Sequence, residues 1–152
     1  MNSELDDLYR EVIIDHSRHP RHFHVMEDAD ATAEGFNPFC GDRVTVYLKK
    51  QDDRLADISF QGKGCAICMA SASIMTQTVR GRRTDDALRL FDWFHNLLTV
   101  DQPSTQPPDE QAEPLAVLAG VRQFPIRVKC ATLAWHALKT AMTRGGGVAS
   151  TE

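Results

Sequence analysis

The sequence predicts an α+β domain in which a small antiparallel three-stranded sheet packs against four to five helices. Two observations support this fold class. The segments 43–50 and 55–61 alternate between apolar and polar residues, as half-buried strands do. Much of the remaining chain carries apolar residues at helical spacing. With 152 residues, of which 42% are hydrophobic and 25% charged, the chain is long enough to bury a core as one domain.

The first helix is predicted at the N-terminal end. Its apolar side chains fall on one stripe, formed by Leu5, Leu8, Tyr9, Val12 and Ile13. The helix should end before Pro20, because a residue that precedes proline avoids the α conformation. Four histidines gather around this proline: His16, His19, His22 and His24. They offer metal-binding groups, but a solvated and weakly basic corner is the favoured interpretation.

A hairpin is predicted next. Residues 43–50 and 55–61 are joined by the turn 51–54, so the two strands should pair antiparallel. Their inward-facing residues are Val44, Val46, Leu48, Ala56, Ile58 and Phe60. A further strand is expected around 30–36, which completes a sheet of three.

The second half is predicted to be helical, with helices at 66–80, 85–98, 114–121 and 130–143. Four of the seven prolines lie in 99–114, which indicates an exposed loop. The last residues, 144–152, begin with a run of glycines and are expected to form a flexible tail. The predicted domain therefore comprises residues 1–143.

Composition excludes several classes of function. The formal net charge of −4 argues against a nucleic-acid binder that relies on overall positive charge. No apolar run approaches the roughly 20 residues of a membrane span, and the acidic N-terminus lacks the features of a signal peptide. A cytoplasmic protein without nucleic-acid or membrane partners is expected. Four cysteines are too few for a disulfide scaffold, and in a reducing compartment they indicate metal or sulfur chemistry.

The candidate site consists of Cys40, Asp42, Cys65 and Cys130, with Cys68 near it. Gly41 allows a tight turn, so that Cys40 and Asp42 can face one point. Cys65 begins the helix predicted at 66–80, where the helix dipole favours a thiolate, and Cys130 is expected at the start of the last helix.

This set of donors suits zinc, which accepts thiolate and carboxylate ligands in a tetrahedral shell. Iron–sulfur clusters take thiolate ligands as well. Free cysteines are also often only small buried hydrophobic residues. The spacing by itself favours metal or cluster binding and leaves the choice between them open.

The motifs resemble those of the U-type iron–sulfur cluster assembly proteins, the family of IscU and the NifU N-terminal domain. The resemblance covers residues 5–143. It is carried by the segments LYREVIIDH at 8–16, NPFCGD at 37–42, GKGCAI at 62–67, SAS at 71–73 and FPIRVKCATLAW at 124–135.

The resemblance is strongest to the SufU branch. IscU-type scaffolds carry histidine immediately before the last cysteine, where this chain has Lys129, and the long segment between Cys65 and Cys130 is a further SufU feature. The resemblance implies a zinc ion held by Cys40, Asp42, Cys65 and Cys130. It also implies that Cys40 accepts persulfide sulfur from a SufS-type cysteine desulfurase and relays it to downstream scaffolds or apo-protein acceptors.

Several alternatives remain open at this stage. One is an IscU-like scaffold that assembles a [2Fe–2S] or [4Fe–4S] cluster on Cys40, Cys65 and Cys130, and another is a module in which zinc only holds the helices together.

Cys68 stands where the family commonly has serine; a passive substitution is favoured over a fourth ligand or a resolving thiol. Arg127 and Lys129 are expected to share one face of an extended strand beside the site. The protein is expected to relay sulfur rather than act as a stand-alone enzyme, as a monomer or weak homodimer.

Overall fold

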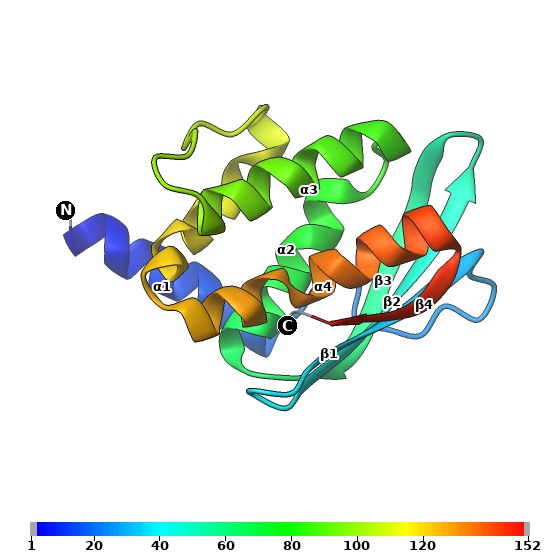
Figure 1. The fold of residues 1–152 in the computed structure, drawn as a ribbon, viewed down its shortest axis with the longest axis horizontal. Coiled ribbons are helices and arrows are strands. Elements are labelled where there is room, and N and C mark those ends of the chain that lie inside the picture. Colours follow the sequence, from blue (N-terminus) through cyan, green and yellow to red (C-terminus); the bar gives the residue numbers. More distant parts are fainter. Residues whose placement is uncertain (1–2, 151–152) are drawn as a thin grey trace.

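The computed structural model describes residues 3–150, and the side chains of residues 6–149. The side chain of Leu5 and the last two residues of the predicted tail therefore lie outside the described residues. The elements follow one another in the order α1 (Ser3–Arg18), β1 (Ala31–Asn37), β2 (Asp42–Gln51), β3 (Arg54–Lys63), α2 (Ala66–Val79), α3 (Thr84–Thr99), a 3-10 helical segment η1 (Glu110–Gln123), α4 (Pro125–Arg144) and β4 (Gly146–Ser150). Figure 1 shows the helices gathered beside one sheet.

The sheet has four strands in the order β3-β2-β1-β4, so the prediction of three strands is wrong in number. The first three strands pair antiparallel as expected, and β4 pairs parallel with β1. The fourth strand lies in the segment that was expected to be a flexible tail. The α4 helix ends at Gly145, whose positive φ of 74° reverses the chain, and the next residues run back along β1.

One face of the sheet packs against helices and builds the core. The inward residues of β2 are Val44, Val46 and Leu48, and all are fully buried. On β1 the buried positions alternate with exposed ones along the whole strand. The α4 helix contacts both β1 and β2, and α2 contacts α4 and β3. These contacts place the N-terminal ends of α2 and α4 near one end of the sheet.

The α1 helix packs on α2 through a buried polar contact. His16 Nδ1 lies 2.7 Å from Ser73 Oγ, and the same hydroxyl accepts a hydrogen bond from the backbone amide of Arg21. Burial lowers the pKa of His16. The expectation of a solvated histidine corner is therefore wrong for His16, which joins two helices.

Candidate metal and sulfur site

Four predicted site residues come from three separate parts of the chain. Cys40 lies in the turn between β1 and β2, and Asp42 is the first residue of β2. Cys65 is the N-cap of α2, and its side chain makes no capping hydrogen bond. Cys130 lies in the second turn of α4, because that helix begins at Pro125 and not at residue 130. Proline at a first helical position needs no N–H partner, which explains the earlier start.

Cys40, Asp42 and Cys130 form a compact group. One ligand atom from each, two Sγ atoms and a carboxylate oxygen, lie within 4.8 Å of one another. The Sγ atoms of Cys130 and Cys40 are 3.3 Å apart. Asp42 and Cys130 are fully buried, whereas Cys40 is half-buried. Only one of the three is therefore reachable from solvent, and it lies on a turn.

Cys65 touches this group through its backbone. Its amide donates a 2.9 Å hydrogen bond to Asp42 Oδ1, which ties the start of α2 to the start of β2. The Cys65 thiol falls outside the compact group of three, although it contributes to the environment of Cys130. The structure thus brings all four predicted residues to one place, with three of them at mutual ligand distance.

The environment of Cys130 favours its neutral form. Burial, and after it hydrogen bonding with Asp42, Cys40 and Cys65, raises the pKa of this thiol above its ordinary range. A divalent cation would reverse this preference, because metal ligation requires the thiolate. Thiolates and one carboxylate are the donors that zinc accepts, so the residues present fit a zinc ion.

Asn37, which has no predicted role, contacts two residues of the site. It is fully buried, and its amide nitrogen lies 3.4 Å from Asp42 Oδ2 and 3.7 Å from Cys130 Sγ. Its carbonyl groups hold the turn: Oδ1 accepts from the Phe39 amide and the backbone oxygen accepts from Gly41. A signal existed in the sequence, because asparagine occupies an inward position of the β1 alternation.

Gly64 leaves room for the carboxylate. A Cβ atom at this position would lie 2.8 Å from Asp42 Oδ1 and 3.0 Å from Cys68 Sγ. The first distance is too short for a real contact, and the second would require Cys68 to shift. The glycine before Cys65 is therefore required by the packing of the site and not only by the flexibility of the turn.

Cys68 lies in the core. It is fully buried and belongs to the hydrophobic cluster that fills the interior. Burial raises the pKa of its thiol far above the ordinary value. Like the Cys65 thiol, the Cys68 thiol lies outside the compact group, but Cys68 is buried whereas Cys65 is half-buried, which favours the interpretation of a passive substitution.

Arg127 and Lys129 do not share a face. The extended strand expected here is wrong, because both residues lie near the start of the α4 helix. In a helix, residues two apart point in different directions. The pKa of Arg127 is raised, first by the charge of Cys65 and then by hydrogen bonding to Cys130. Lys129 Nζ instead lies 4.3 Å from the centroid of the Phe39 ring.

Exposed apolar side chains flank the site in sequence. Phe39 precedes Cys40, and Phe124 and Ile126 lie at the start of the helix that carries Cys130. Their exposed fractions are 63%, 59% and 60%. Large apolar side chains this exposed are typical of surfaces that contact other proteins.

Comparison with known proteins gives consistent matches. The model of the NifU-like N-terminal domain matches residues 8–131. The iron–sulfur cluster assembly scaffold protein IscU of Streptococcus pyogenes is 41% identical over 93% of this chain and 87% of its own length. The zinc-dependent sulfurtransferase SufU of Bacillus subtilis is 38% identical over 96% of this chain and 97% of its own.

A solved structure has the same fold. The crystal structure described as a SUF-system iron–sulfur cluster assembly scaffold protein from Fervidobacterium islandicum superposes with a TM-score of 0.80 and 31% identity. It covers 88% of this chain and 95% of the other. Within residues 3–150, no helix is long and apolar enough to span a membrane.

Proposed function

Because the chain belongs to the NifU-like N-terminal domain family of iron–sulfur cluster assembly proteins, in its SufU-type branch, we propose that it accepts persulfide sulfur on a zinc-containing site. The sulfur would come from a SufS-type cysteine desulfurase and pass to downstream scaffolds or apo-proteins. The observation that carries the proposal is the half-buried Cys40, on a turn, in contact with the buried Cys130 and Asp42.

Zinc would be held by Cys40, Asp42, Cys65 and Cys130. When bound, it supplies the positive charge that keeps thiols deprotonated at neutral pH. Other groups of the protein contact these ligands: the Asn37 side-chain amide faces both Asp42 and Cys130, and the Cys65 backbone amide donates a hydrogen bond to the Asp42 carboxylate. Such contacts orient the ligands and fix their geometry.

Sulfur transfer is a thiolate exchange that needs no outside oxidant or reductant. The Cys40 thiolate attacks the terminal sulfur of the donor persulfide, a new S–S bond forms on Cys40, and the donor cysteine leaves as a thiolate. The negative charge is on the Cys40 thiolate before the transfer and on the donor cysteine thiolate after it, so the charge balances. The positive charge of Arg127, whose pKa is raised by Cys65 and Cys130, favours the anionic forms on both sides of the exchange.

Cys40 is the cysteine best placed for this step. It is half-buried and lies on a four-residue turn, whereas Cys130 is fully buried in a helix and Cys65 begins another. A turn can move a ligand toward a donor without unfolding an element. Phe39 beside it, with Phe124 and Ile126, offers the apolar surface against which the donor would pack.

The test is transfer of labelled sulfur from the desulfurase to this protein, with Cys40→Ser compared with Cys68→Ser. The proposal expects loss of label on the first variant and label equal to the wild type on the second. Label that persists on Cys40→Ser and disappears from Cys68→Ser would contradict it.

Asp42→Asn should speed release of sulfur from the site by about tenfold or more, because a neutral amide is a weaker zinc ligand than a carboxylate and leaves the site easier to open. The amide side chain preserves the volume at a fully buried position. The measurement is the rate at which label moves from this protein to a downstream acceptor. An unchanged rate would show that Asp42 does not control opening.

The second candidate is a scaffold that assembles a [2Fe–2S] or [4Fe–4S] cluster on Cys40, Cys65 and Cys130. It is favoured by the 41% identity to the Streptococcus IscU. The same cysteines serve both candidates, so mutation of the ligands does not separate them. Iron and acid-labile sulfide bound in the purified protein would do so.

A further inference from the structure

Two cations meet on the outer face of the sheet beside the site. Arg43 on β2 and Lys63 on β3 lie directly opposite each other, and both are exposed. Successive side chains of a strand point to opposite faces, so Asp42 is buried at the site while Arg43 faces outward. Lys63 precedes Cys65 by two residues. A partner bound here would therefore sit next to the site.

These two charges are not compensated by the side chains of residues 6–149. Like charges directly opposite across two strands destabilise a sheet. Among the described side chains, neither Arg43 nor Lys63 forms an ion pair. Glu34, the acidic residue nearest in register, lies opposite Thr45 and pairs with neither cation. The fold thus keeps an unfavourable pair of charges at this place.

Other basic residues of the sheet region have partners within the chain. Lys50 and Arg54 each donate a hydrogen bond to a backbone carbonyl, of Met142 and Gly81 respectively. Lys49 Nζ lies 3.1 Å from a carboxylate oxygen of Asp28, and Arg80 Nε lies 3.2 Å from one of Asp57. Among the described side chains, Arg43 and Lys63 form neither an ion pair nor a side-chain hydrogen bond, and both lie at the end of the outer face that adjoins the site. An acidic ligand would supply the missing partner.

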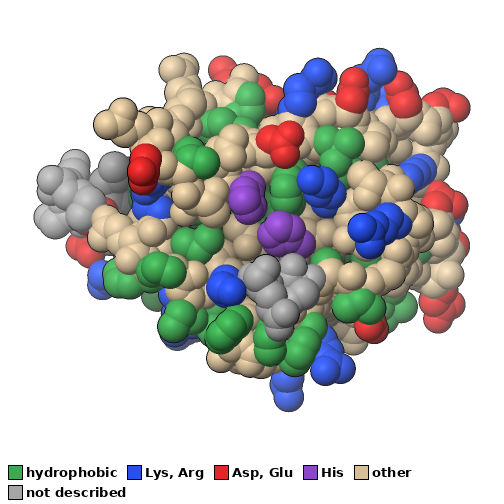
Figure 2. All heavy atoms as spheres, viewed as in Figure 1, with side chains coloured by type: hydrophobic (Ala, Val, Ile, Leu, Met, Phe, Trp, Pro, Cys, Tyr) green, Lys and Arg blue, Asp and Glu red, His purple; other side chains and the backbone are tan. Residues whose placement is uncertain are grey.

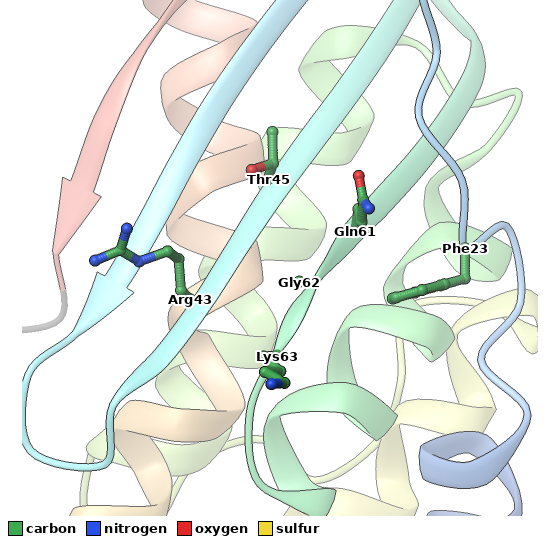
Figure 3. A pocket seen from close by; sticks show the side chains of 6 residues that line it. All are labelled: Phe23, Arg43, Thr45, Gln61, Gly62 and Lys63. Carbon is green, nitrogen blue, oxygen red and sulfur yellow. The ribbon is translucent and has the colours of Figure 1, made fainter.

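The surface around the two cations is hollowed and partly aromatic. A depression of about 380 Å³ is lined by Phe23, Arg43, Thr45, Gln61, Gly62 and Lys63. Figure 3 shows Arg43 and Phe23 at opposite sides of it, with Thr45 and Gln61 between them. The Arg43 guanidinium lies over the ring of Phe36, 5.1 Å from the ring centroid. Phe23 and Phe36 are 40% and 38% exposed.

We propose that this surface docks an acidic segment of the cysteine desulfurase, and the proposal rests on the proposed function, which supplies that partner. Three residues lie opposite one another on adjacent strands: Phe36, Arg43 and Lys63. The width of this row across the strands is about 10 Å, which is wider than one small anion. An acidic protein segment offers carboxylates for the cations and apolar side chains for the rings. The net charge of −4 disfavours a nucleic acid by long-range repulsion.

Lys63→Glu separates docking from folding. The change converts a like-charged pair into an oppositely charged pair with Arg43, so the variant should be at least as thermally stable as the wild type. Its affinity for the desulfurase should fall about tenfold or more, and the salt dependence of binding should weaken. Calorimetric titration at two salt concentrations, together with thermal unfolding, measures both effects.

Arg89→Glu is the matched control, because Arg89 is an exposed basic residue on α3 with a side chain 73% exposed. It should bind the desulfurase like the wild type. Equal affinity of Lys63→Glu and wild type would overturn the docking proposal and leave the proposed function intact. Absence of any wild-type binding would overturn both. Wild-type binding of a single-stranded oligonucleotide that Lys63→Glu abolishes would identify a nucleic-acid surface and contradict the proposal.

Discussion

Asn37 shows how one side chain organises the site. It lies directly opposite Asp42 in the register of β1 and β2, so its amide reaches the carboxylate across the strands. The same amide faces Cys130, and the rest of the residue closes the turn that carries Cys40. Loss of this side chain would affect two proposed ligands directly and the third through the turn.

Asn37→Ala should therefore weaken zinc binding by about 10- to 100-fold, the usual cost of removing a group that orients metal ligands. Competition with a chromophoric chelator measures the affinity. Asn96→Ala, a change at an exposed asparagine of α3, serves as the control and should bind zinc as the wild type does. Equal zinc affinity of Asn37→Ala and the wild type would show that the contacts do not support the site.

At the scale of elements, Arg82 fastens the corner between α2 and α3. Its side chain is 5% exposed and donates to the Thr78 carbonyl, to Asp86, and through two nitrogens to Asp109. Asp109 in turn caps η1 by accepting from the Ala112 amide. One guanidinium thus connects three helical segments.

Arg82→Ala should lower the free energy of unfolding by about 2 kcal/mol, which is less than for a fully buried ion pair because both aspartates keep about 40% of their side chains exposed. Arg83→Ala is the matched control. The Arg83 side chain is 54% exposed and pairs only with exposed aspartates, so about 0.5 kcal/mol or less is expected. Urea unfolding measures both. Equal losses of unfolding free energy in the two variants would contradict the role of Arg82 in joining the helices.

The elements also show what the sequence could and could not predict. Alternation of apolar and polar residues identified β2 and β3, and the strand expected around 30–36 lies close to β1, along which buried and exposed positions alternate. The fourth strand has none, since Gly146, Gly147 and Val148 look like a tail and are ordered by parallel pairing with a strand more than 100 residues earlier. Pairing that distant has no local signal.

The site was predictable to a similar degree. Motif residues identified Cys40, Asp42, Cys65 and Cys130, which the structure brings together. The orientation of Arg127 and Lys129 was not predictable from an assumed strand, because Pro125 starts a helix there and turns the two side chains apart. The contacts of Asn37 depend on strand register, which a motif does not specify.

At the scale of the whole molecule, a pair of half-buried histidines makes the fold sensitive to acid. Figure 2 shows two histidine side chains beside each other, over α3 and α4. The rings of His95 and His136 are 5.6 Å apart, and each contacts Phe91. Burial, and after it the charges of His95 and Lys139, lowers the pKa of His136 to about 4.

The unfolded chain binds a proton at His136 below its ordinary pKa of 6.5, whereas the folded chain does so only near pH 4. Stability should therefore fall as the pH is lowered from about 6.5 to 4, by about 1 to 2 kcal/mol from this residue, because solvent screens the charge of a partly exposed ring. Urea unfolding of zinc-free protein at several pH values tests this. His136→Leu should lose less stability than wild type over that range.

His19→Leu provides the control, because the His19 side chain is 78% exposed. It should follow the wild-type pH dependence. Parallel curves for wild type and His136→Leu would refute the assignment of acid sensitivity to this residue.

The central claim concerns what the buried donors hold, and metal analysis tests it most directly. Protein purified anaerobically should contain about one zinc per chain and no acid-labile sulfide, because the donor set of three cysteines and Asp42 suits a tetrahedral zinc ion. Iron with a matching amount of sulfide would contradict the claim and identify the site as a cluster scaffold.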